Sequence, residues 1–410
     1  MRTDAKTAQA IVLERAANLD ELVSIILAGR VSGRTPVHSR VELRPVKIKG
    51  VLRVQFTFTS ASGTTTHNAE TGEALEMLAA HLDAGYANFT VRTTTSLWQC
   101  RLTKREVALT HEQMLESAVD LRHDRPKRRM LEPADPVLRA VGISDGAGKI
   151  KPSMYDKYRQ VDEFVRIFAA TVERAITSGT LREPTEALPL RIVDLGCGYA
   201  YLTFAVMSWA THTRGWPIEV VGVDRRAESV ARNQSLADSL GAHSMTFVAA
   251  NISDADVFNG LAVSVVLALH ACDTATDDAL AWAVRRQAGV VLAAPCCHHN
   301  VQAQLHSAPE PYGLLTRFDV LKERFGDVLT DALRAAVLRQ QGYRVDVIEF
   351  IGGEHTARNI LIRAVHTGAE PSAEVETSMR AILGDWEISL PLEHQLNTRT
   401  SRSGSKPKQK

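Results

Sequence analysis

The stretch "RIVDLGCGYAYLTFAV" at residues 191–206 decides the fold of the second half of the chain. An apolar run ends in Asp194, glycines follow at Gly196 and Gly198, and a helical pattern begins directly after them. Glycine lets the backbone approach a ligand closely, and the free N–H groups at a helix start favour an anionic group. The stretch predicts a strand, a turn and a helix at a ligand site, although a plain tight turn would also need glycine.

Further apolar segments follow at regular spacing, at residues 218–224 ("IEVVGVD"), 245–251 ("MTFVAAN"), 263–270 ("VSVVLALH") and 289–295 ("GVVLAAP"). Helical patterns separate these continuous apolar runs, which is typical of a parallel sheet covered on both faces. Residues 343–351 and 359–366 lie close enough together to form a hairpin. We therefore predict an α/β domain whose sheet ends in an antiparallel pair.

The front of the chain has a different pattern. Residues 41–68 and 89–110 are rich in Val, Thr and aromatic residues and predict strands, with a helix over 69–85 between them. Residues 1–30 read as one amphipathic helix, and residues 154–177 predict a second, longer one. We expect a smaller α+β domain in front of the α/β domain.

These patterns give the following division of the chain. We predict an α+β substrate-recognition domain over 1–121, a basic linker and helical connector over 122–185, the α/β domain over 186–368, a helical extension over 369–396 and an unfolded basic tail over 397–410.

Composition excludes several classes of protein. The 410 residues carry a net charge of +1, and their five cysteines show no disulfide-framework or zinc-finger spacing. Neither a signal peptide nor an apolar run long enough to span a bilayer is evident, so we expect a cytoplasmic protein without a membrane role. Residues 1–160 hold 24 Lys and Arg against 18 Asp and Glu, which points to a polyanion-facing front half.

The second strand ends in Asp224, whose carboxylate suits two ribose hydroxyls. A nicotinamide motif would place its third glycine near position 201, where this chain has Tyr201. The order Asp-x-Gly-x-Gly instead resembles motif I of the class I S-adenosylmethionine (SAM) methyltransferases, although Ala200 stands where their third glycine falls. The resemblance implies a Rossmann-like seven-stranded domain with SAM as cofactor.

The same resemblance implies where SAM contacts the chain. Its amino-acid end would lie over Gly196 and Gly198 with Asp194 nearby, and its ribose on Asp224. Its adenine would lie beside Asn251 and Ile252.

Segments 269–280 ("LHACDTATDDAL"), 295–299 ("PCCHH") and 355–364 ("HTARNILIRA") resemble a narrower family. That family is related to the eukaryotic tRNA ribose 2′-O-methyltransferases of the acceptor stem and to animal methyltransferase-like proteins. The resemblance covers residues 150–366. Leu269 stands where the tRNA enzymes tend to have Lys, Asp273 replaces a Gly, and their zinc-finger cysteines are absent, so their substrate does not carry over.

The ends of the fourth and fifth strands should face the transferred methyl group. His270, beside the cofactor, and Asp273, His298 or His299 are candidate general bases. Alternatively Cys296 or Cys297, with Cys272, could attack a pyrimidine ring as a thiolate. These residues could also simply be packed. We expect no metal, because adjacent cysteines fit two corners of one tetrahedral site poorly.

Basic residues indicate an RNA partner. The segment "RHDRPKRR" (122–129) offers cations for phosphate contacts, namely Arg122, Arg125, Lys127, Arg128 and Arg129, and Trp98 or Phe89 could stack a base. Tyr155, Lys157 and Gln160 are expected over the SAM pocket. The sequence thus predicts methyl transfer to structured RNA, tRNA or rRNA. Protein methylation, or SAM or RNA binding without strong catalysis, are the alternatives.

Overall fold

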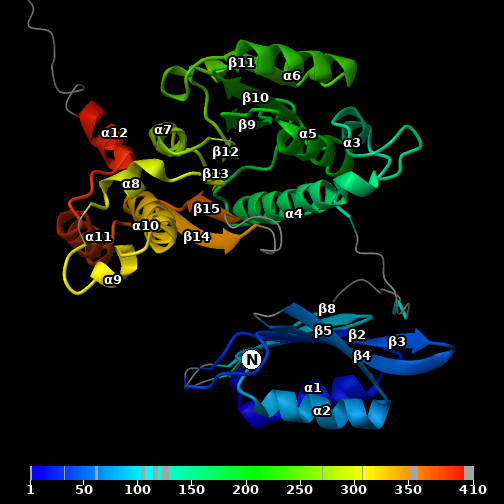
Figure 1. Ribbon diagram of the computed structural model, residues 1–410. Coiled ribbons are helices and arrows are strands. Elements are labelled where there is room, and N and C mark those ends of the chain that lie inside the picture. Colours follow the sequence, from blue (N-terminus) through cyan, green and yellow to red (C-terminus); the bar gives the residue numbers. More distant parts are fainter. Residues whose placement is uncertain are drawn as a thin grey trace, which may run out of the picture. The chain divides into compact units, whose positions relative to one another are not determined.

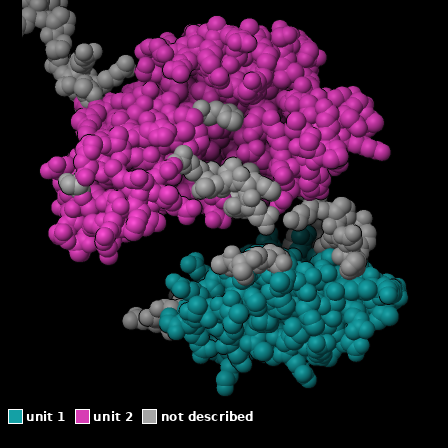
Figure 2. All heavy atoms as spheres, viewed as in Figure 1, with its two compact units in different colours: residues 1–128 teal, residues 129–410 magenta. Residues whose placement is uncertain are grey.

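The chain forms two compact units, Met1–Arg128 and Arg129–Lys410 (Figure 2). The computed structural model describes residues 2–31, 33–60, 63–102, 107–113, 119–121, 129–269, 271–306, 308–350 and 359–400. The division between the units falls inside the segment that the sequence marks as a linker. Among the described residues, no helix is both long and apolar enough to cross a membrane.

Unit 1 is a fully antiparallel sheet with two helices on one face (Figure 1). Its strands lie in the order β1-β8-β7-β6-β2-β3-β4-β5. In chain order the elements are β1 (Arg2–Thr3), α1 (Ala5–Ala17), β2 (Leu22–Ala28), β3 (Arg40–Ile48), β4 (Val51–Ser60), β5 (Gly63–Ala69), α2 (Thr71–Asp83), β6 (Asn88–Thr93), β7 (Ser96–Leu102) and β8 (Val107–Gln113).

The interpretation of residues 1–30 as a single helix is wrong beyond Ala17. The helix ends at Asn18, and residues Leu22–Ala28 form β2, which pairs with β3 on one side and β6 on the other. Ile25 and Leu27 are fully buried under the helices. Branched side chains suit the pleated surface of a central strand, and this tertiary packing overrides the helical periodicity.

The other face of the unit 1 sheet is polar, because side chains alternate between the two faces of a strand. Cross-strand pairs bring Arg101 beside Asn88, and Gln99 beside Thr90. Gln55 connects Arg44 and Asn68 through side-chain hydrogen bonds of 2.9 and 3.2 Å. We call this surface the open face. Its basic and uncharged polar residues include Ser24, Arg44, Gln55, Asn68, Asn88, Thr90, Arg92, Gln99, Arg101 and Thr110, and the same register also places Ile26, Glu42, Leu97 and Glu112 on it.

Unit 2 is an α/β domain. In its described residues a seven-stranded sheet has the order β11-β10-β9-β12-β13-β15-β14. The strands are β9 (Leu190–Leu195), β10 (Ile218–Asp224), β11 (Met245–Ala249), β12 (Val265–Ala268), β13 (Val290–Ala293), β14 (Tyr343–Glu349) and β15 (Ile360–His366). The first five are parallel, whereas β15 runs antiparallel to both β13 and β14. The predicted parallel sheet and terminal hairpin are confirmed.

Helices cover both faces of this sheet. The α-helices are α3 (Pro136–Ala140), α4 (Tyr155–Thr177), α5 (Tyr201–Ser208), α6 (Ala227–Ser239), α7 (Thr274–Arg285), α8 (His299–Gln304), α9 (Gly313–Thr316), α10 (Asp319–Gln340), α11 (Ala373–Asp385) and α12 (Pro391–Thr400). Short turns of other helix types lie at Pro152–Met154, Trp209–Thr213, Ile252–Asp254 and Phe258–Gly260.

The central strands β9, β10, β12 and β13 each contribute to two cores. Within β9, Ile192 packs in the core formed with α4 and α5, and its neighbour Val193 packs in the core formed with α7 and α10. Burial on both faces explains why the strands are continuously apolar. The last helix runs to Thr400, past the start of the predicted tail at Asn397, and residues 401–410 lie outside the described residues.

Candidate active site

The turn after β9 is held in a left-handed backbone conformation at three positions. The φ angles are 73° at Gly196, 54° at Gly198 and 51° at Ala200. A Cβ atom on Gly196 would lie 3.4 Å from Ala271, which follows β12, so this glycine also allows the two loops to pack closely. Ala200 adopts a backbone conformation that favours glycine, so the alanine at this position is strained.

Asp224 at the end of β10 is tied to this turn. Its Oδ2 accepts a 2.9 Å hydrogen bond from the Gly198 N–H, and its Oδ1 accepts bonds from the backbone N–H and Nε of Arg226. Burial alone would raise the pKa of Asp224, but these hydrogen bonds and the Arg226 charge more than offset it and lower the pKa. Asp224 is therefore an anion at the mouth of the turn.

Asp194 lies beneath the turn and is fully buried. Its Oδ2 accepts a short hydrogen bond from the Thr203 hydroxyl on α5, while Oδ1 has no hydrogen-bond partner among the described residues. Burial raises the pKa of Asp194 to about 7, and the nearby Asp224 charge adds to this effect. The residue fixes the start of α5 and presents no exposed surface to a ligand.

Two residues of α6 complete the turn and were missed in the sequence. Asn233, fully buried, donates from Nδ2 to the Gly198 carbonyl at 2.8 Å. Arg232 donates to the Tyr199 carbonyl and lies 3.9 Å over the Tyr199 ring. In the sequence, the only signal for these two residues is their position about two turns into the helix that follows Asp224. Many helical residues have such a position, so it does not single them out.

The amino end of α4 reaches the first residue of α5. Lys157 Nζ lies 4.1 Å over the Tyr201 ring, and the Tyr201 hydroxyl donates to Gln160 Oε1 at 2.7 Å. Tyr155 is half exposed and packs edge-on against Tyr158. The structure thus brings Lys157 and Gln160 to the turn, and it leaves Tyr155 on the surface nearby.

The loop after β11 lies next to Asp224. Asp224 pairs with Ala249 in register, and the Ala250 N–H donates to the Asp224 carbonyl. Asn251 is exposed and hydrogen-bonds Asp254, while Ile252 is half-buried against the α7 core. Both candidate adenine contacts therefore border the ribose candidate.

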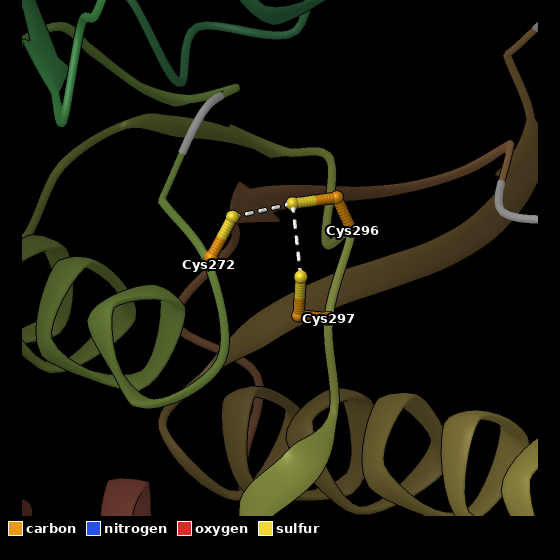
Figure 3. A group of neighbouring side chains, drawn as sticks. All are labelled: Cys272, Cys296 and Cys297. Carbon is orange, nitrogen blue, oxygen red and sulfur yellow. Dashed lines mark hydrogen bonds between the residues drawn. The ribbon is translucent and has the colours of Figure 1, made fainter.

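The loops after β12 and β13 bring three cysteines together (Figure 3). Sγ of Cys296 lies 2.7 Å from Sγ of Cys272 and 3.7 Å from Sγ of Cys297. Cys272 is exposed and the other two are half-buried. We call this set the thiol cluster. Burial and the two neighbouring thiols raise the pKa of Cys296, so a free Cys296 thiolate is disfavoured at neutral pH.

His298 lies buried against α10, with Nε2 3.0 Å from Asp331 Oδ1 and Nδ1 3.0 Å from Asp327 Oδ1. This arrangement suits a positioning residue better than a base acting on a substrate. His299 is exposed at the start of α8. His270 lies outside the described residues.

Asp273 connects the two loops. Its Oδ1 accepts the Asn300 N–H at 3.0 Å, and its carbonyl accepts a 2.8 Å bond from Arg334 Nη2 on α10. Its φ of 52° is in the region that favours glycine, so Asp273 is held in a strained backbone conformation. Arg334 also pairs with the buried Asp277, so α10 clamps the loop that carries Cys272.

Of the basic residues in 122–129 that the sequence predicts to contact RNA, the structure describes Arg129. Arg122, Arg125, Lys127 and Arg128 lie outside the described residues. Arg129 is mostly buried, 3.4 Å from Asp162 and over the Tyr158 ring on α4. In unit 1, Phe89 is buried in the core and cannot stack a base, and Trp98 stacks on His111 under Arg15.

Two cavities among the described residues of unit 2 lie at different places on its sheet. One of about 590 Å³ is lined by Lys157, Tyr199, Tyr201 and Arg232, beside the glycine turn. Another of about 750 Å³ lies at the amino ends of the strands, around Leu190. Ligands bind at the carboxyl ends of parallel strands, and the first cavity lies beside the turn at that end, although Gly196, Gly198 and Asp224 are not among its lining residues.

Comparison with known proteins agrees with this geometry. Residues 156–304 match the family model described as a methyltransferase domain. No curated protein matches the chain. Similar solved structures include magnesium protoporphyrin IX methyltransferase from Synechocystis PCC 6803 with bound SAH, at 16% identity and a TM-score of 0.33 over 56% of this chain and 92% of that one. An rRNA methylase from Streptococcus thermophilus has 9% identity and a TM-score of 0.31 over 51% and 95%. Likeness at this level carries no argument about substrate.

The matched domain makes the chain a methyltransferase with SAM as methyl donor. The residues at the turn fit this cofactor. Asp224 is an ionised acceptor with lone pairs for hydroxyl groups, and Asp194 keeps one buried oxygen without a partner in the described structure.

Proposed function

We propose that this SAM-dependent methyltransferase transfers its methyl group to structured RNA, tRNA or rRNA, which unit 1 recognises. The observation that carries the proposal is the open face of unit 1. It presents arginines among Thr, Asn and Gln side chains on a broad antiparallel sheet.

The chemistry of the open face suits a nucleic acid. Arg92 and Arg101 are exposed. Arg92 pairs with Ser24 on one side and Leu97 on the other, and Arg101 pairs with Asn88. Guanidinium groups bind phosphate with two parallel hydrogen bonds, and amide and hydroxyl groups bind ribose and base edges. The excess of basic residues over residues 1–160 adds long-range attraction for a polyanion.

In unit 2 we assign cofactor binding to the glycine turn and its neighbours. Gly196 and Gly198 would admit the amino-acid end of SAM, Asp224 would bind the ribose, and Asn251 with Ile252 would border the adenine. Asp194 supports this turn from beneath. SAM, when bound, supplies a methyl group on a positively charged sulfur.

The acceptor would be held by the loops after β12 and β13. In-line transfer depends on orientation, which a wall built from two clamped loops supplies. Asp273, placed between those loops, is the described candidate to hold or accept a proton from the acceptor. His270 remains a candidate by its position in the chain.

The first test uses RNA from a strain that lacks this gene. Purified protein and SAM labelled in the methyl group are incubated with total tRNA and rRNA of that strain, and nucleosides are analysed by mass spectrometry. We expect one methylated nucleoside to appear, and the same nucleoside to be missing from the deletion strain. Label that enters protein but no RNA would overturn the proposal.

The second test concerns the open face. Arg92→Glu together with Arg101→Glu should weaken RNA binding at least 10-fold and reduce the dependence of log Kd on log salt, because phosphate contacts are lost. Lys6→Glu changes an exposed charge on α1, on the helix side of unit 1, and serves as the control. Equal RNA affinity of both variants, with SAM binding intact, would contradict recognition by this face.

A further inference from the structure

The thiol cluster has the geometry of a metal site. All three Sγ atoms lie within 4.8 Å of one another, although Cys272 follows β12 and the adjacent pair Cys296 and Cys297 follows β13 (Figure 3). The expectation of no metal rested on the adjacency of Cys296 and Cys297 and on the lack of a Cys-x-x-Cys partner elsewhere in the sequence. The fold adds a third thiol from the neighbouring strand.

The distances fit thiolate ligands around one small cation. With zinc–sulfur bonds of about 2.3 Å, two ligands of a tetrahedral site have sulfur atoms about 3.8 Å apart. Cys296 and Cys297 are already 3.7 Å apart. Cys272 and Cys296, at 2.7 Å, need to separate by about 1 Å, which a rotation of the exposed Cys272 side chain allows.

The surrounding structure holds the ligands in place before any metal binds. Asp273, next to Cys272, is bonded to Asn300 near Cys297, so the two loops are connected directly. Arg334 fixes the Asp273 carbonyl, and His298, next to Cys297, is held by α10 carboxylates. Such outer partners orient metal ligands and raise affinity.

We propose that Cys272, Cys296 and Cys297 bind one Zn²⁺ through three thiolates, with a fourth position open to water. Three protein ligands and one open position are typical of zinc sites that take part in chemistry rather than only in folding. Each thiol gives its proton to solvent when it binds, so binding releases three protons per zinc from these ligands. The proposal does not depend on the RNA substrate.

The site lies next to the cofactor turn. Ala271, the residue before Cys272, packs against Gly196: a Cβ atom added to Gly196 would lie 3.4 Å from Ala271. Zn²⁺ bound by three thiolates would place a net charge of −1 at the edge where the acceptor is expected, with the open position of the zinc available to an acceptor oxygen or nitrogen. The ligand class is therefore a thiophilic divalent cation at the acceptor side of the active site.

The test measures zinc in full-length protein purified with thiols reduced and dialysed against zinc-free buffer. We expect one equivalent of zinc by mass spectrometry of the metal, and cobalt substitution should give a sulfur-to-cobalt charge-transfer band. Cys272→Ser, Cys296→Ser and Cys297→Ser should each lower zinc affinity at least 100-fold in competition with a chelator. Cys100→Ala, which changes a buried cysteine of unit 1, is the control and should keep the metal.

Two results would overturn the proposal. One is reduced protein that binds no zinc at micromolar concentration. The other is a Cys272–Cys296 disulfide that persists under those reducing conditions, shown by peptide mass spectrometry, which would assign the pair to redox chemistry. SAM binding and thermal unfolding report whether each variant folds. Cys272→Ser, at an exposed position, decides the matter if the other variants do not fold.

Discussion

Arg334→Met should destabilise unit 2 strongly, because Arg334 is a fully buried cation that neutralises two buried carboxylates. Its Nε and Nη2 bond both oxygens of Asp277 at 3.1 and 2.7 Å, and Nη1 lies 3.3 Å from Asp331 Oδ1. The arginine and Asp277 side chains are 1% and 2% exposed. Methionine fills a similar volume and leaves Asp277 without its counter-charge.

The magnitude follows from this burial. Removing one partner of a buried ion pair costs about 3–5 kcal/mol, because the remaining charge stays desolvated. With a urea dependence of about 3 kcal/mol per molar, the unfolding midpoint should fall by about 1–2 M. Arg286→Met is the matched control. Arg286 lies 2.7 Å from Asp256, the same distance, but Asp256 is 74% exposed, so its loss should cost less than about 1 kcal/mol.

The assay is urea unfolding followed by tryptophan fluorescence, which reports mainly on unit 2 because four of the five tryptophans lie there. The double variant Arg334→Met with Asp277→Leu removes both charges and should recover at least half of the loss. Equal losses in Arg334→Met and Arg286→Met would refute the reasoning. A double variant less stable than Arg334→Met would do the same.

Asp224→Asn should weaken SAM binding about 10- to 100-fold by titration calorimetry, because hydrogen bonds to a charged acceptor contribute about 1.5–3 kcal/mol; the exposed Arg225→Ala should not, and equal affinities would contradict the assignment. Asp194 has a pKa raised by burial to about 7, against 3.8 ordinarily, so the folded state binds the proton more tightly. Keeping Asp194 ionised in the folded state therefore costs more stability as the pH rises from about 4 to about 7. The Asp194→Asn variant should be more stable than the natural chain near pH 8 but not near pH 4. If the free energies of unfolding of both proteins, measured in urea, changed in parallel with pH, the reasoning would be contradicted. Gly222→Ala places a Cβ 2.4 Å from a buried aromatic ring and should cost about 1–3 kcal/mol, whereas Gly384→Ala, with open space around it, should cost nothing in thermal unfolding.

The α/β fold could be predicted because each of its central strands is recognisable from its own residues. Continuous apolar runs such as Val290–Ala293 require burial on two faces, and the glycine turn and Asp224 mark the first two strands. The sequence favours a helix over residues 22–28 because Leu22, Ile25 and Ile26 lie at helical spacing, whereas the side chains that β2 buries are Leu22, Ile25 and Leu27. Only pairing with β3 and β6, from later in the chain, decides between helix and strand.

The candidate site could be predicted only where its chemistry is local. Gly196, Gly198 and Asp224 are found from motif and spacing. His298 seemed a base from its place beside Cys297, yet two carboxylates of α10, about thirty residues later, hold it in the interior. The thiol cluster likewise depends on the register between β12 and β13, which no single segment reveals.

The order of the strands in the sheet determines how far the carboxyl end of this chain can be truncated. The matched methyltransferase domain ends at residue 304, but the strand that pairs with the free edge of β13 is β15, from residues 360–366. Leu390 and Leu392, at the start of α12, are buried against α7 and its neighbours. A fragment cut at the end of the match would therefore leave β13 unpaired on one side, next to the loops that carry the thiol cluster. Such a fragment should aggregate, because the unpaired backbone N–H and C=O groups of an apolar edge strand can pair with a strand of another molecule.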